Sequence, residues 1–129
     1  MANWNGVRDF IKGKYTVAKD DGDYLAMVFN TTDGRDQLVS VKKIQTGQGE
    51  VWVQISSPVG YIPIKYMDDA LELLDNKMCG GLVKIGDKHF VRHCMPVADL
   101  STEELDDPLH IVINVADELE KKFVGGDEN

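Results

Sequence analysis

The densest group of reactive side chains in this sequence is the hexapeptide HFVRHC at residues 89–94. If this segment is a strand, its alternation places His89 and His93 on one face, where both could bind one metal ion. A third ligand would have to come from His110, Cys79 or a carboxylate, and no recognised zinc-binding spacing supplies it. We therefore interpret the two histidines as lying on the exposed face of a hairpin, and we expect no cofactor.

A cysteine nucleophile is the other chemistry that the sequence offers. Cys94 directly follows His93, but adjacent residues of a strand point to opposite faces, which counts against a Cys-His pair. A two-residue turn at Gly86-Asp87 would place Cys79 across from Cys94, at the wider spacing that fits a disulfide less comfortably. We expect two buried or half-buried thiols and no enzymatic activity. The alternative is a small metal-binding protein or enzyme that uses His89 and His93 with a cysteine.

Two glycine-containing segments could bind ions but have simpler explanations. The aspartates of DDGD at residues 20–23 lack the alternating oxygen ligands and the bidentate Glu of a calcium loop. We interpret this segment as a turn. The GQG at residues 47–49 lacks the strand, loop and helix setting that binds phosphate.

The composition is that of one globular domain. The chain has 129 residues, 43% hydrophobic and 28% charged, and we expect a single domain at residues 1–124 with a flexible acidic tail at 125–129. The net charge is −8 and the basic residues are scattered, which argues against nucleic acid and favours basic or apolar protein segments as partners. Charges and a glycine interrupt the first ten residues. We therefore expect no secretory signal, no membrane span and a cytoplasmic location.

Three apolar segments, at residues 24–30, 37–44 and 51–57, are expected to form an antiparallel meander at the centre of the fold. They are rich in Val, Ile, Tyr and Trp, and turn-forming segments with Gly and Asp separate them. Residues 51–57 show the clearest alternation of side-chain type, which predicts one face buried in the core and one face partly exposed to solvent. Residues 24–30 are apolar on both faces, so we expect a helix or another subunit to pack on each.

The segments that flank the meander predict shorter elements. Apolar residues at helical spacing predict a helix at residues 4–12, and alternation predicts a first strand at 14–19. Two prolines and a glycine make SPVGYIPIKY, residues 57–66, an extended connector that cannot lie in the centre of a sheet.

A helix and a hairpin are expected after the connector. Asp69 and Glu72 have the spacing of a capping box, which predicts a helix at residues 68–78. Strands at 82–85 and 89–95 then form a hairpin around the turn that begins at Gly86.

The last part of the sequence predicts two helices. STEE at residues 101–104 is a second capping-box pattern and predicts a short helix at 102–106. Asp107 followed by Pro108 predicts the start of the longest helix, which Gly125-Gly126 ends.

Five apolar side chains lie where the core would not obviously absorb them. Trp52 is on the face of its strand that is predicted to be partly exposed to solvent, and the other four belong to the connector at residues 57–66. Exposed groups of this kind usually mark an interface, although a helix that covers them would explain them equally well. The predicted partner-binding residues, for another copy of the chain or a client peptide, are Trp52, Tyr61, Ile62, Ile64 and Tyr66.

Several loose motifs accompany this order of elements. They are Gly13-Lys14-Tyr15 after the first helix, Gly34-Arg35, SPVG at residues 57–60, the DALELLDN helix that opens at Asp69, and HFVRH before the last helix. With them, nearly the whole chain resembles the type III secretion chaperone-like fold and, within it, the YbjN-like proteins, often described as sensory-transduction regulators. The resemblance implies a non-enzymatic homodimer that binds an extended client over apolar surfaces, and it implies no catalytic residue.

Together these patterns predict an α+β fold of the secretion-chaperone-like kind. An antiparallel sheet of about five or six strands would pack one face against the N-terminal and C-terminal helices, with a middle helix between strands. The expected function is a protein-binding module, chaperone-like or regulatory, that binds a protein or peptide segment through an apolar face.

Overall fold

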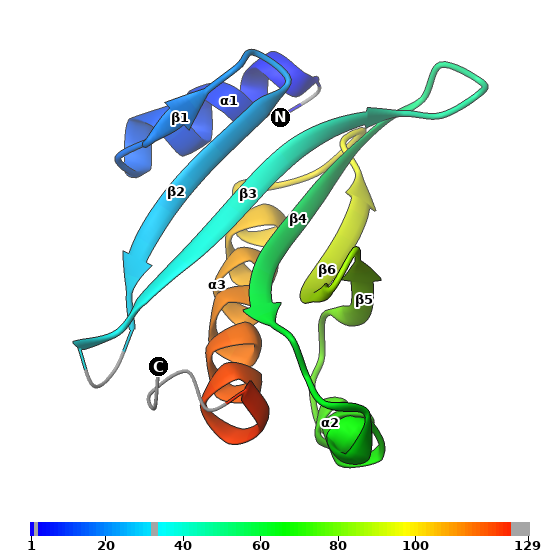
Figure 1. Cartoon of the computed structure of the whole chain (residues 1–129). Coiled ribbons are helices and arrows are strands. Elements are labelled where there is room, and N and C mark those ends of the chain that lie inside the picture. The colour runs from blue at the N-terminus through cyan, green and yellow to red at the C-terminus, as the bar shows by residue number, and fades with distance from the viewer. Residues whose placement is uncertain (2, 32–33, 125–129) are drawn as a thin grey trace.

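The chain folds into a six-stranded antiparallel sheet with three α-helices in the part that the computed structural model describes, residues 1, 3–31 and 34–124 (Figure 1). The predicted α+β class is confirmed. The helices are α1 (Trp4–Lys14), α2 (Met67–Leu74) and α3 (Thr102–Leu119). The strands are β1 (Lys19–Asp20), β2 (Tyr24–Asn30), β3 (Asp36–Gln45), β4 (Val51–Gly60), β5 (Gly81–Ile85) and β6 (Lys88–Pro96). A 3₁₀ turn, η2 (Ile64–Tyr66), precedes α2, and a π-helical turn, η3 (Glu120–Val124), follows α3.

Helices cover one face of the sheet. The strand order is β1-β2-β3-β4-β6-β5, so β1 and β5 are the two edges. In Figure 1, α1 and α3 lie behind the sheet, and no described helix covers the face turned toward the viewer. On β2, Leu25 and Met27 are fully buried toward the helices, whereas Val28 on the other face is 53% exposed. Within the described chain, only one of the two apolar faces of β2 is therefore covered.

The core lies between the covered face of the sheet and the helices. Alternate residues of the central strands point into it, among them Val39 and Val41 on β3 and Val53 and Ile55 on β4. The buried apolar side chains of α3 that oppose them are Leu105, Leu109, Val112, Ile113, Val115, Ala116 and Leu119. Burial of one Leu, Ile or Val side chain contributes about 1.5–3 kcal/mol to the free energy of folding. The packing of α3 against the sheet is therefore a main source of the stability of this fold.

Strand β4, a central strand of the sheet, continues through Pro58 to Gly60, contrary to the prediction that residues 57–66 cannot lie in the centre of a sheet. Proline has no N–H to donate, and the pairing between β3 and β4 stops at Ser40 and Ser56. Side chains bridge the two strands beyond that point, because Gln37 Nε2 donates to Pro58 O at 2.7 Å and to Ser57 Oγ at 2.8 Å. The connector therefore begins only after a bulge between Pro58 and Gly60.

Helix α3 is one continuous helix instead of the predicted pair. The capping box at Ser101 and Glu104 is confirmed, and Ser101 Oγ accepts from the Glu104 N–H at 3.1 Å. Pro108 lies inside the helix, so the predicted new start at Asp107 is wrong. The helix continues because the gain from burying apolar side chains on both sides of Pro108 exceeds the cost of one missing hydrogen bond. Its predicted end at residues 125–126 and the predicted tail at 125–129 lie outside the described residues.

Two further elements differ from the sequence prediction. The predicted strand at residues 14–19 is wrong except at Lys19: α1 extends to Lys14, residues 15–18 are neither helix nor strand, and β1 comprises only Lys19 and Asp20. Helix α2 has Tyr66 as its N-cap with no side-chain cap, so the predicted capping box at Asp69 is wrong. The 3₁₀ turn η2 runs directly into α2 and replaces the cap. None of the helices in the described chain combines the length and apolarity needed to cross a lipid bilayer.

Candidate protein-interaction site

The two histidines of β6 lie on the covered face of the sheet, not on the exposed face predicted for them. They share this face of β6 with Val91 and Met95, which are buried. His89 is only 5% exposed, and His93 is half-buried. Because a strand rises about 3.3 Å per residue, the two histidines are roughly 13 Å apart along β6, too far to share one metal ion. No group of three or more His, Cys, Asp or Glu side chains in residues 1, 3–31 and 34–124 could hold a metal ion.

His89 has a structural role that the sequence did not reveal. Its Nδ1 accepts a hydrogen bond from the backbone N–H of Ile62 at 3.0 Å. An imidazole nitrogen that accepts carries no proton, so His89 is neutral with its proton on Nε2. The ring centroid also lies 6.0 Å from that of Tyr61. The connector after β4 is thereby fixed against β6.

Neither cysteine has the environment of a nucleophile. Both are free; Cys79 is half-buried, whereas Cys94 is exposed, contrary to its prediction. The predicted turn at Gly86-Asp87 is confirmed, because Gly81 pairs with Arg92 and Ile85 with Lys88. Burial raises the pKa of both thiols, and Arg92 offsets this only in part at Cys94. A raised pKa disfavours the thiolate that nucleophilic chemistry requires.

His110, the other candidate ligand, belongs to a separate cluster between α1 and α3. Its Nε2 lies 2.8 Å from the hydroxyl of Tyr15, which donates to Asp106 Oδ1 at 2.5 Å. Burial and the hydrogen bond to Asp106 raise the pKa of Tyr15. Lys14 Nζ lies 2.8 Å from Asp106 Oδ2. The cluster connects two helices by hydrogen bonds, and its tyrosine keeps its proton at neutral pH because its pKa is raised.

Trp52 is separated from the other predicted partner-binding residues. It lies near the start of β4, about 27 Å along the strand from Gly60, where the connector begins. Its ring is half-buried, and its Nε1 donates to Glu50 Oε1 at 2.8 Å. Ile44 of β3 pairs with it across the sheet. Trp52 therefore belongs to the uncovered sheet face and not to a surface shared with the connector.

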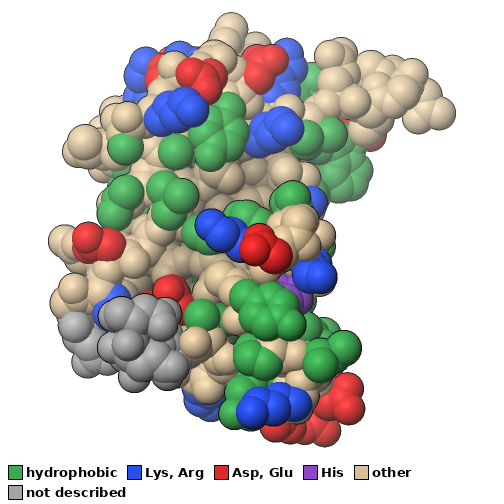
Figure 2. Space-filling model, in the orientation of Figure 1, with side chains coloured by type: hydrophobic (Ala, Val, Ile, Leu, Met, Phe, Trp, Pro, Cys, Tyr) green, Lys and Arg blue, Asp and Glu red, His purple; other side chains and the backbone are tan. Residues whose placement is uncertain are grey.

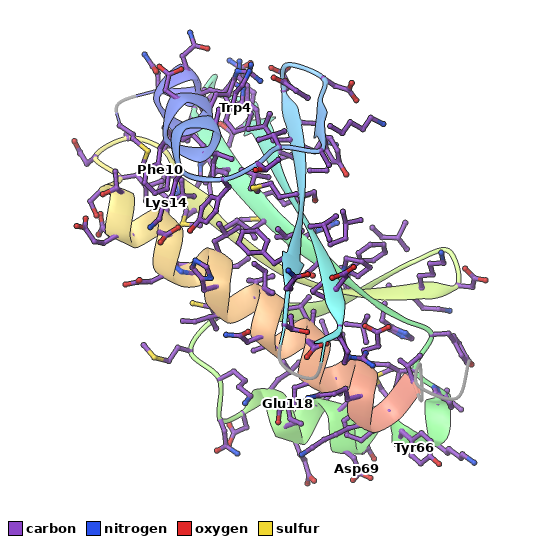
Figure 3. The ribbon with its side chains drawn as sticks, turned by 90° about the vertical axis from the view of Figure 1, so that its left-hand side faces the viewer. Trp4, Phe10, Lys14, Tyr66, Asp69 and Glu118 are labelled. Atoms are coloured by element: carbon purple, nitrogen blue, oxygen red, sulfur yellow. The ribbon has the colours of Figure 1, made fainter. Side chains whose placement is uncertain are left out.

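The predicted partner-binding residues of the connector differ in exposure. Ile62 is 1% exposed, so its predicted place on the partner surface is wrong, and its side chain belongs to the core. Tyr61 is 52% exposed and Ile64 is 85% exposed, as a partner surface requires. Tyr66 is partly exposed, and its ring lies 6.1 Å from that of Phe123 on η3. Figure 3 shows Tyr66 at the opposite end of the molecule from Trp4.

Most of the exposed large apolar side chains of the described chain are close to α2. Two of the eight, Val28 and Leu38, pair across β2 and β3. Five of the other six, which we call the α2 corner, lie on α2 or next to it in the chain and are Tyr61, Ile64, Tyr66, Leu71 and Met78; the sixth, Ile85, ends β5 and lies on the face opposite Lys84. Figure 2 shows hydrophobic side chains gathered over α2 and the segment that leads into it, with charged groups of both signs among them. Leu71 and Met78 were not among the residues predicted to bind a partner, because apolar residues at helical spacing in the predicted helix at 68–78 are equally typical of core positions.

A hollow of about 170 Å³ lies within the α2 corner. Ile62 and His89 are its buried members, and the others are Tyr61, Ile64, Met67 and Lys84. The hollow is mainly apolar but includes one ammonium group and one imidazole. Such a mixture of apolar walls and a few polar groups is typical of sites that bind a ligand or a side chain.

Helix α2 itself has few contacts with the rest of the fold. Ala70 is its only buried residue. Beyond its C-terminal end, Lys77 Nζ contacts Glu118 Oε1 of α3 at 2.8 Å, and this hydrogen bond lowers the pKa of Glu118. The α2 corner is thus an apolar surface on a weakly buried helix, held in place by His89 and by one ion pair.

Compared with models of known protein families and with curated proteins, the chain has no match. The resemblance to the YbjN-like proteins therefore stays a prediction.

Proposed function

We propose that this protein is a non-enzymatic protein-binding module, chaperone-like or regulatory, that binds a protein or peptide segment through the α2 corner. The observation that carries the proposal is that five of the eight exposed large apolar side chains of the described residues lie on α2 or next to it in the chain, from Tyr61 to Met78. Apolar groups gathered in this way mark an interaction surface more often than scattered ones do. The two free thiols suit the reducing cytoplasm, where we place the protein.

The exposed side chains are sufficient for a moderate affinity. Burying one Leu, Ile or Phe side chain contributes about 1.5–3 kcal/mol. A complex with micromolar affinity needs about 8 kcal/mol after the cost of association has been met. Several corner side chains must therefore be buried together, and a partner that contacts only Ile64 would bind weakly.

Binding of labelled apolar peptides, measured by fluorescence anisotropy, tests the proposal. The wild-type protein should bind at least some of them, and Ile64→Lys should weaken this binding by roughly tenfold or more. Val28→Lys is the matched control, because Val28 is exposed but lies on β2 away from the corner. Equal binding by wild type and Ile64→Lys, or an equal loss in Val28→Lys, would overturn the proposal.

A second copy of the chain is the other occupant of this surface, and it would make the protein a homodimer. Light scattering after size-exclusion chromatography measures this directly. A dimer that Ile64→Lys dissociates, and Val28→Lys does not, would also support an interaction through the α2 corner. A strict monomer that binds none of the peptides would contradict the proposed function.

A further inference from the structure

We propose that β5 is a docking edge, where an extended acidic segment of a partner adds antiparallel as a further strand and places a carboxylate between Lys84 and His89. This rests on the proposed function and gives the chemical class of the segment and the way in which it binds. The groups involved are the free backbone edge of β5, the hollow of the α2 corner and the local charge.

The edge of β5 offers backbone groups to a further strand. β5 pairs only with β6, and the pair Ile85–Lys88 closes the two-residue turn. In such a ladder hydrogen-bonded and non-hydrogen-bonded pairs alternate, so the N–H and C=O groups of Leu82 and Lys84 point away from β6. No backbone group of the described residues outside the strands bonds to them. A free edge of this kind is a template for an added strand.

The opposite edge of the sheet is not equivalent. β1 has two residues, and its Asp20 is held by Arg8 of α1, with Nη1 and Oδ1 2.6 Å apart. A short edge strand beside a helix is a common way to prevent pairing with another chain. β1 pairs only with residues 25 and 26 of β2, so β5 is the longer of the two edge strands, and it is the one beside the hollow.

The hollow beside β5 contains two hydrogen-bond donors. Lys84 and His89 are cross-strand partners on the same face, and both line the hollow. With Nδ1 of His89 used by Ile62, its protonated Nε2 has no acceptor among the described residues. His89 as a whole is only 5% exposed, but Nε2 is not among the buried atoms without a partner, so an acceptor can reach it from the hollow. A carboxylate satisfies both this donor and the ammonium group.

Local charge favours an acidic segment over a second copy of the chain. The hairpin at residues 81–96 carries Lys84, Lys88 and Arg92 against Asp87, a net charge of +2 in a chain of net charge −8. Two β5 edges paired with each other would bring +2 against +2. At physiological salt the screening length is about 8 Å, so these local charges outweigh the distant acidic ones.

The probe is an acetylated, amidated octapeptide of alternating Glu and Val, labelled for fluorescence anisotropy. In antiparallel addition its Glu side chains lie on the same face as Lys84, and its Glu N–H groups point toward β5. N-methylation of the Glu residues should therefore weaken binding by roughly tenfold or more, whereas N-methylation of the Val residues should leave it unchanged. Equal binding by the two N-methylated peptides, or weaker binding by the Val-methylated one, would overturn the proposal. A peptide of alternating Lys and Val should bind more weakly than the Glu peptide.

Substitutions of Lys84 give an independent test. Lys84→Pro removes the outward N–H without breaking the β5–β6 ladder, and proline is tolerated at such edge positions. Lys84→Ala keeps the N–H and removes only the charge. The Pro variant should lose more affinity than the Ala variant, with both checked for thermal unfolding. Since the methylated peptides use the wild-type protein, a Pro variant that fails to fold leaves the proposal testable.

The two proposals fail in different ways. If Ile64→Lys weakens peptide binding but N-methylation and Lys84→Pro do not, the α2 corner binds partners and strand addition is wrong. If N-methylation of Glu weakens binding and Ile64→Lys does not, strand addition is correct and the apolar corner is not the site. A dimer that excludes the peptide from β5 would show that a second copy occupies this edge, and would overturn the acidic-segment proposal.

Discussion

The Nδ1 atom of His89 accepts a hydrogen bond from the backbone N–H of Ile62, 3.0 Å away, and both residues are buried. A buried N–H without an acceptor is costly. This bond therefore fixes the chain at the point where β4 has ended and the path toward α2 begins. With the ion pair between Lys77 and Glu118, this hydrogen bond is one of two polar contacts that hold the α2 corner in place.

Replacing His89 with Phe is expected to lower the free energy of unfolding by about 1–3 kcal/mol, because the Ile62 N–H loses its acceptor. Denaturant unfolding measures this change. His89→Asn is the matched variant, since its side-chain oxygen can replace Nδ1. Hydrogen exchange of the Ile62 amide separates the two: it should stay slow in the Asn variant and become fast in the Phe variant. Slow exchange in both would show that the hydrogen bond is not what protects this amide.

Asp20 is predicted to make stability depend on pH in the acidic range. The hydrogen bond from Arg8, with help from the Gly22 N–H and Lys12, holds the pKa of this carboxyl well below its usual value. A carboxyl with a lowered pKa stabilises the fold above its unfolded pKa of about 3.9 and loses this contribution as the pH falls further. Asp20→Asn should therefore be less stable than wild type at pH 6, and the difference should shrink below about pH 4.

Asp21 provides the control for that experiment. Its carboxylate is exposed, and it lies 3.6 Å from the exposed Nζ of Lys19. Surface pairs of this kind contribute little, so Asp21→Asn should leave the denaturation midpoint almost unchanged at both pH values. If Asp21→Asn and Asp20→Asn behave alike, the contact with Arg8 does not account for the effect.

Gly80 is expected to tolerate no side chain. Its φ is +100°, and a Cβ atom there would lie 2.6 Å from Cγ1 of Val91, a stiff and fully buried residue. Gly80→Ala should cost more than the roughly 1–3 kcal/mol of an unfavourable backbone conformation alone. Gly86 is the comparison, because its φ is also positive, +62°, but nothing lies within 4 Å of the added atom. Thermal unfolding should rank Gly80→Ala clearly below Gly86→Ala, and the reverse order would contradict the role of Val91.

The sequence predicted the elements that depend on local pattern. The meander from β2 to β4 and the hairpin around Gly86 follow from alternation and turn residues, which act over a few positions. The continuation of β4 through Pro58 could not be predicted in this way. It depends on Gln37, a residue about twenty positions earlier, whose side chain donates to the Pro58 carbonyl and to the Ser57 hydroxyl and so bridges β3 and β4 where their backbone pairing has stopped.

The candidate site was predicted only in part, and for a related reason. Tyr61, Ile64 and Tyr66 are exposed as expected. The face of β6 on which His89 lies depends on the pairing of β6 with β4, and both faces of HFVRHC mix apolar and polar side chains. Alternation alone therefore could not tell which face is covered.

Tyr15 supports the last prediction, which concerns the contact between α1 and α3. Its hydroxyl donates to Asp106, and burial together with this bond raises the pKa of Tyr15. Tyr15→Phe keeps the ring packed against Phe29 and removes only the hydroxyl. We expect a loss of about 1–2 kcal/mol in the free energy of unfolding at pH 7. A tyrosine with a raised pKa stabilises the fold below its unfolded pKa of about 10 and loses this contribution as the pH rises further, so the difference between wild type and Tyr15→Phe should shrink above pH 10.

Tyr24 supplies the control for Tyr15, because its ring is also half-buried and its hydroxyl bonds to none of the described residues. Tyr24→Phe should leave the unfolding free energy at pH 7 within experimental error. Urea unfolding of the three proteins at pH 7 and at pH 10.5 makes the comparison. If Tyr15→Phe is as stable as Tyr24→Phe at pH 7, Lys14 alone is sufficient to satisfy Asp106, and the hydroxyl of Tyr15 does not hold α1 against α3.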